Sequence, residues 1–143
     1  MDDELRKVIE MSDAGIVILD EDYNISFVNK SASELTGYQI EEFLGMNFMD
    51  IFSTENKKII KVTIAGYKIE ESIRSCSEIE ILTAQGNRKE TEICIAITRG
   101  SNGTIKIYAY LRDISERKKS EAILIEFLDT GKGIPPKYIS KTI

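Results

Sequence analysis

The sequence contains no histidine and no tryptophan, and its 143 residues include only two prolines and two cysteines. Without histidine, the chain has no imidazole to act as a general acid or base, as a metal or haem ligand, or as a phosphoryl acceptor. Cys76 and Cys94 form no Cys-x-x-Cys motif and are too few for a zinc site. We therefore expect two reduced, half-buried thiols in a cytoplasmic protein, with a redox role as the less favoured alternative.

Long apolar runs and an excess of positive charge are also missing. The longest apolar runs, such as Ile93–Ile97 and Ala122–Ile125, are far shorter than the roughly 18 residues that a membrane span needs. The opening residues MDDELRKV do not resemble a signal peptide. The net charge of −5, with no long basic stripe, argues against a nucleic-acid partner. What remains is the composition of one soluble domain, 42% hydrophobic and 30% charged.

The periodicity of apolar residues predicts a helix, two strands, several short helices and three strands, in that order. We expect helices over residues 2–12, 31–36, 39–44 and 47–52, then a longer helix with Ile60, Ile64 and Tyr67 on its core-facing side. The expected strands cover residues 15–19, 23–29, 78–81, 91–98 and 104–111, with Ile25 and Phe27 on one face of the second. This order predicts an α+β domain, in which helices cover one face of a five-stranded antiparallel sheet.

Polar residues stand at two of the junctions between these elements. The amide of Asn29, between a strand and a helix, is expected to bond backbone donors there. Asp113 or Ser115 can accept hydrogen bonds from the first turn of the last helix, and Asp113 with Glu116 has the spacing of a capping box.

With four short motifs, this order of elements resembles the PAS domains of two-component and related signalling proteins. The motifs are Ala14–Asp20, the stretch from Phe27-Val-Asn29 to Thr36-Gly37-Tyr38, Glu41–Gly45, and Arg112–Lys118. The resemblance runs from about Met11 to Lys119. It implies a PAS domain over residues 13–115, a flanking helix over 1–12, and an exit linker over 116–128 that is helical or partly strand. It also implies that Asp113, Ile114 and Ser115 couple the sheet to the outgoing helix.

PAS domains usually have a cavity between the helices and the inner face of the sheet. The resemblance implies that this cavity is lined here by Phe27, Phe43, Phe48, Phe52, Ile60, Ile64, Ile95 and Ile107. A solid core would show the same apolar periodicity, so both interpretations stay open.

The resemblance argues against two PAS cofactors. Flavin-binding photosensors carry a reactive cysteine in the motif GxNCRFLQ, but this chain reads GMNFMD over residues 45–50, with Phe48 at the cysteine position. Haem-binding PAS domains mostly use a histidine, which is absent. We expect no cofactor, although a small apolar or aromatic ligand is an open alternative.

The end of the chain resembles a second family. Residues 122–141 are similar to the first glycine box of histidine-kinase ATPase domains, with the core Asp129-Thr-Gly131-Lys-Gly133-Ile-Pro. In that family the Asp contacts the adenine and the glycines allow the lid to bend. The phosphoacceptor histidine, the Asn box and the second glycine box are missing, so we expect residues 129–143 to be a remnant without kinase activity.

Residues 123–128 would be a strand in the parent kinase, but here they can instead extend the exit helix. Such a helix would present Leu124, Ile125 and Leu128 to a partner, which predicts a homodimer. We therefore expect a non-catalytic sensory module that works with a kinase or response regulator. The alternatives are an ATP-binding kinase fragment and an adaptor subunit of an intact kinase.

Overall fold

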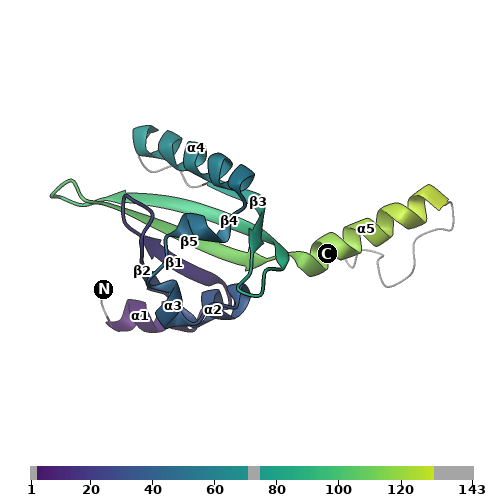
Figure 1. Cartoon of the computed structure of the whole chain (residues 1–143), viewed down its shortest axis with the longest axis horizontal. Coiled ribbons are helices and arrows are strands. Elements are labelled where there is room, and N and C mark those ends of the chain that lie inside the picture. Colours follow the sequence, from purple (N-terminus) through teal and green to yellow (C-terminus); the bar gives the residue numbers. More distant parts are fainter. Residues whose placement is uncertain (1–2, 71–74, 131–143) are drawn as a thin grey trace. The chain divides into compact units, whose positions relative to one another are not determined.

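The computed structural model describes residues 3–70 and 75–130. The chain divides into two compact units, Met1–Asp113 and Ile114–Ile143. The first unit contains a five-stranded antiparallel sheet and the helices before and between its strands (Figure 1). The described part of the second unit is one helix, α5 (Ser115–Thr130).

The elements of the first unit follow the predicted order. They are α1 (Asp3–Glu10), β1 (Gly15–Leu19), β2 (Ile25–Val28), α2 (Lys30–Thr36), α3 (Ile40–Phe43), the 3-10 helix η1 (Phe48–Ile51), α4 (Thr54–Glu70), β3 (Ser75–Leu82), β4 (Arg88–Arg99) and β5 (Ile105–Asp113). The α+β fold class is therefore confirmed. The structure also lengthens the last three strands, because their ends pair with each other beyond the apolar alternation that predicted them.

The strands lie in the order β2-β1-β5-β4-β3, and each neighbouring pair is antiparallel. The last strand, β5, is therefore the central one and pairs with both β1 and β4. Helices α2 to α4 carry the chain from the β2 edge to the β3 edge.

One face of the sheet packs against the helices. Alternate apolar residues of β1, β3, β4 and β5, with Ile25 and Val28 of β2, are buried there, and they form one cluster with residues from α2, α3, η1 and α4. The strand members are Val17, Leu19, Ile25, Val28, Ile79, Ile81, Ile93, Ile95, Ile105, Ile107, Ala109 and Leu111. Burial of this apolar surface is the main force that holds the helices on the sheet.

A bulge in β2 corrects one prediction from the sequence. Val17 pairs with Val28 and Ile18 with Phe27, but Leu19 pairs with Ile25 rather than with the residue after it. The extra residue places both Ile25 and Val28 in the core. Phe27 instead pairs with Ile18 on the opposite face, so the expectation that Ile25 and Phe27 share a face was wrong.

The short helix α2 is attached to β1 by Asn29, as the sequence predicted. The side-chain oxygen of this fully buried N-cap residue accepts hydrogen bonds from Ile16 N (2.8 Å) and Ala32 N (3.0 Å), and its amide donates to Ala14 O (3.0 Å). One amide thus satisfies backbone groups of both the strand and the helix.

Two glycine substitutions, one at the contact between β1 and α2 and one on the open surface of α4, should have opposite effects on stability. In Gly15→Ala the new Cβ would lie 2.8 Å from the backbone Cα of Ala32, so we expect a loss of about 2 kcal/mol in the free energy of unfolding. Gly66→Ala, in α4 with open space around it, should instead stabilise the protein by about 0.5–1 kcal/mol. Urea denaturation measures both, and a neutral or stabilising Gly15→Ala would contradict this packing.

Candidate functional site

Seven of the eight predicted cavity residues lie together in the core. Phe43, Phe48, Phe52, Ile60, Ile64, Ile95 and Ile107 all belong to the apolar cluster, each at most 2% exposed. The rings of Phe48 and Phe52 meet edge to face with centroids 5.3 Å apart. Phe27 lies on the other face of the sheet and leaves this set. That the remaining seven surround a ligand stays a prediction.

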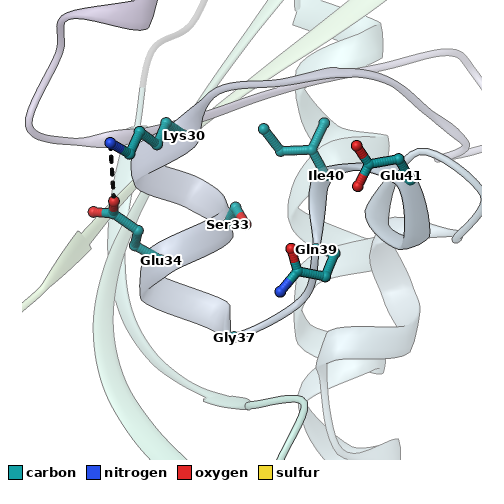
Figure 2. Close-up of a pocket in the computed structure, with 7 residues that line it drawn as sticks. All are labelled: Lys30, Ser33, Glu34, Gly37, Gln39, Ile40 and Glu41. Carbon is teal, nitrogen blue, oxygen red and sulfur yellow. Dashed lines mark ion pairs between the residues drawn. The ribbon is translucent and has the colours of Figure 1, made fainter.

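Sequence reasoning missed a groove of about 500 Å³ at the surface between α2 and α3 (Figure 2). It is lined by Lys30, Ser33, Glu34, Gly37, Gln39, Ile40 and Glu41. Lys30 and Glu34 form an ion pair at 3.7 Å, and Ser33 Oγ donates to Tyr38 O at 2.6 Å. The lining combines charges of both signs, one amide and the aliphatic side chain of Ile40. The glycine at position 37 signals the end of a helix, but no pattern in the sequence signals the groove.

The C-terminal end of α2 is held by the β3–β4 hairpin. Gly37 ends the helix with φ 82°, a left-handed conformation that favours glycine. Ala84 N donates to Thr36 O at 2.9 Å, and Lys89 Nζ donates to Leu35 O at 2.8 Å. These donors satisfy carbonyl groups that have no partner within the helix, and the lysine charge is favourable at a helix C-terminus.

Lys89 also reaches the exit motif, the three residues Asp113, Ile114 and Ser115 that are predicted to couple the sheet to the outgoing helix. Its Nζ lies 3.7 Å from Oδ2 of Asp113, the last residue of β5. The lysine side chain is 28% exposed and the aspartate side chain 45% exposed. Lys89 therefore connects the end of α2 with the end of the central strand. The sequence contains one signal for this role of Lys89. It stands two residues before Thr91 and four before Ile93, so a charged side chain occupies the face of β4 on which those two are buried.

The other two residues of the exit motif begin the second unit. Ile114 O accepts from Lys118 N at 3.0 Å, which closes the first turn of α5, and Ser115 is the first residue of that helix. Capping of α5 by the side chain of Asp113 or Ser115 stays a prediction.

The structure decides between the two conformations expected for residues 123–128. They belong to α5, which runs without a break to Thr130 and includes an i,i+4 ion pair between Arg117 and Glu121 at 3.6 Å. Ile125 is 58% exposed on this helix. Asp129 of the glycine-box resemblance lies in α5, whereas Gly131 and Gly133 lie outside the described residues.

Two side chains have pKa values shifted from their ordinary range. Burial of Tyr23, with a smaller contribution from the Asp22 carboxylate, raises the pKa of its phenol. The hydrogen bond from Arg112 to Glu92, at 2.7 Å, and the charge of that carboxylate raise the pKa of the guanidinium. Both shifts favour the protonated form, so neither group becomes an acid or base at neutral pH. Within residues 3–70 and 75–130 no cluster of side chains is suited to a metal ion.

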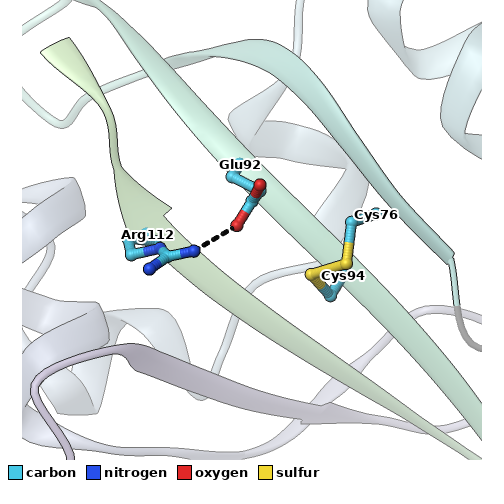
Figure 3. Close-up of a disulfide and its surroundings, with 4 residues drawn as sticks. All are labelled: Cys76, Glu92, Cys94 and Arg112. Atoms are coloured by element: carbon cyan, nitrogen blue, oxygen red, sulfur yellow. Dashed lines mark hydrogen bonds and ion pairs between the residues drawn. A yellow bond between two sulfur atoms is a disulfide. The ribbon is translucent and has the colours of Figure 1, made fainter. Parts of the chain in front are cut away.

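The cysteines correct a second prediction. Cys76 of β3 and Cys94 of β4 are joined in a disulfide, with Cα atoms 4.0 Å apart, rather than being two half-buried thiols (Figure 3). They are direct partners in the antiparallel register. The signal was present in the sequence, because both cysteines stand nine residues from Gln85 in the predicted turn. An antiparallel hairpin centred on that turn places them opposite each other.

Comparison with known proteins identifies the class to which this fold belongs. A family model described as PAS domain matches residues 13–116, so the chain belongs to the PAS domain family. A search of curated proteins found no match. Among the helices of the described residues, none is both long and apolar enough to cross a membrane.

Solved structures with this fold include two PAS domains and one domain of a sensory box protein. One, from a Colwellia psychrerythraea protein, has a TM-score of 0.72 and 21% identity, covering 79% of this chain and 96% of that one. A domain of a sensory box sensor histidine kinase/response regulator from Geobacter sulfurreducens has a TM-score of 0.60 and 22% identity, covering 77% of this chain and 91% of that one. The PAS domain of a LuxR-family transcriptional regulator from Burkholderia thailandensis, in complex with ethanol, has a TM-score of 0.66 and 14% identity. The match covers 80% of this chain and 99% of that one. At these identities the likeness shows the fold alone.

The position of Lys89 predicts a specific loss of stability. Lys89→Met keeps the aliphatic stem but removes the ammonium group from Leu35 O and Asp113, so the free energy of unfolding should fall by about 1–2 kcal/mol. The matched control is Lys106→Met on the exposed face of β5, which should change it by less than about 0.5 kcal/mol. Equal effects of the two substitutions in urea denaturation would show that the Lys89 contacts contribute nothing.

Proposed function

We propose that this PAS domain is a non-catalytic sensory module that responds to a small ligand or a partner protein and passes the response through α5. The PAS fold supports a signalling role in general. The observation that carries the specific proposal is the position of Lys89, between Leu35 O of α2 and the carboxylate of Asp113. Asp113 stands two residues before α5 in the chain.

The proposed response starts at α2 and ends at Asp113. A ligand in the core or in the groove beside α2 would favour one position of this short helix. A shift of Leu35 O would change the hydrogen bond of Lys89 and, with it, the ion pair with Asp113. The ligand acts only through its difference in affinity for the two arrangements, so both must be accessible without it.

The proposed ligand class differs between the core and the groove. The core residues are aromatic and aliphatic, so a ligand among them would be a small apolar or aromatic molecule, whereas the surface groove has charged and amide side chains that could bond a polar group. The complex of the Burkholderia thailandensis PAS domain with ethanol supports a small neutral molecule. No cofactor is included, because the haem and flavin motifs are missing from the sequence.

The proposed partners are a second copy of this chain and a cytoplasmic kinase or response regulator. Ile125 on α5 supplies exposed apolar surface for a helix-to-helix contact. The histidine-kinase connection is supported by the glycine-box resemblance and by the name of the Geobacter sulfurreducens protein. An ATP-binding fragment and an adaptor for an intact kinase are the alternatives, and both rest on the same resemblance.

The proposal predicts that Asp113 controls the exchange of α5 amides. Asp113→Ala should speed hydrogen exchange in Ser115–Ile125 several-fold, and Asp113→Asn should do the same because it removes the charge that Lys89 contacts. Asp50→Ala removes an exposed carboxylate from η1 and is the matched control. If α5 exchanges alike in all four proteins, the coupling through Asp113 does not exist.

Native mass spectrometry tests the ligand and the partner together. We expect a homodimer, with a small molecule retained from the expression host and no ATP adduct when ATP and magnesium are added. Ile125→Glu should favour the monomer because it places a charge in the proposed contact. A monomer in both proteins would contradict the proposed dimer, and an ATP adduct that is lost in Asp129→Asn would favour the nucleotide-binding alternative.

A further inference from the structure

The two cysteines of the disulfide differ in their access to solvent. Cys76 is exposed, and it is the second residue of β3, an edge strand of the sheet. Cys94 is only 7% exposed in β4, which has a strand on each side. A thiol from solution therefore reaches the sulfur of Cys76 more easily than that of Cys94.

Charges next to the disulfide oppose the pairing that it holds. Glu78 lies directly opposite Glu92, and Glu80 lies directly opposite Glu90, so two like-charged pairs follow the disulfide along the same two strands. Opposed like charges destabilise a strand pair. Arg112 bonds Glu92 at 2.7 Å and Arg88 bonds Glu80 at 3.3 Å, which reduces the repulsion. Figure 3 shows the Arg112–Glu92 pair and the disulfide on these strands.

We propose that Cys76 and Cys94 are a reversible redox couple whose substrate is a dithiol reductant, and that reduction releases the N-terminal part of β3 from β4. Three observations carry this proposal: the direct cross-strand bond, the exposed position of Cys76 on an edge strand, and the like charges beside it. In a cytoplasmic protein, where we expect this chain to act, disulfides are usually transient or redox-sensing rather than permanent.

The exchange proceeds in two steps. A thiolate of the reductant attacks Sγ of Cys76 and forms a mixed disulfide, while Cys94 leaves as a thiolate and takes up a proton. The second thiol of the reductant, as its thiolate, then displaces Cys76, which is protonated in turn. The protein gains two electrons and two protons, and the reductant loses them to become a disulfide.

Reduction has a consequence for α2 because the same hairpin supplies Ala84 and Lys89 to its C-terminal end. When β3 is released, the positions of these donors are less restricted. The cell's thiol balance and a bound ligand would thereby change the same contacts, those of Lys89 with Leu35 O and Asp113. This last step alone rests on the proposed function, whereas the redox couple does not.

The experiment compares the full chain after oxidation by oxidised glutathione and after reduction by dithiothreitol. Intact mass should show the gain of two hydrogens, and hydrogen exchange over Ser75–Leu82 should become about tenfold faster or more. Exchange in β1, which does not pair with this hairpin, should not change. The Cys76→Ser/Cys94→Ser variant should exchange like the reduced protein and ignore both reagents.

A further variant tests the contribution of the like charges without touching the cysteines. Glu78→Gln removes one of the opposed charges next to the disulfide, so reduction should accelerate the exchange of β3 less than in the wild type. The proposal is overturned if oxidised glutathione forms no disulfide, or if reduction leaves the exchange of β3 unchanged. If reduction speeds the hydrogen exchange of β3 but leaves that of the α2 amides unchanged, the redox couple stands and its connection to the proposed function fails.

Discussion

Helix α2 has only seven residues, and an isolated helix of this length does not form stably in water. It exists here because the rest of the domain satisfies both of its ends. At the N-terminus the buried amide of Asn29 bonds backbone groups of α2, of β1 and of the residue just before β1. At the C-terminus Ala84 and Lys89 of the β3–β4 hairpin donate to its last carbonyls. The helix is therefore a link between two parts of the sheet that are not adjacent.

This dependence gives the polar contacts more importance than their individual energies suggest. A partly exposed ion pair such as Lys89–Asp113 contributes little stability by itself. Its value lies in what it joins, because Lys89 also holds the end of α2 and Asp113 ends the central strand. The disulfide lies at the opposite end of the same hairpin from Ala84. A thiol reaction at the disulfide and a ligand beside α2 would therefore both change the contacts between this hairpin and the C-terminal end of α2.

The sequence predicted most of the fold because short-range patterns determine it. Alternating isoleucines identified the late strands, and Asn29 identified the junction between strand and helix. Two features that depend on register were missed. The bulge that turns Phe27 away from the core has no signal in the sequence, whereas the pairing of Cys76 with Cys94 follows from their equal distance from the predicted turn. The groove and the bond from Lys89 to Leu35 join residues whose proximity only the assembled fold creates.

The central claim is that Lys89 couples Asp113 to α2, and a double-mutant cycle with hydrogen exchange of the Ser33–Gly37 amides tests it most directly. In the wild type, Asp113→Asn should lower the protection of these amides. In a Lys89→Met background the same substitution should have almost no effect on this protection. The difference between the two backgrounds is the coupling free energy, which should be at least about 0.5 kcal/mol. If Asp113→Asn has the same effect on α2 in both backgrounds, the coupling does not pass through Lys89.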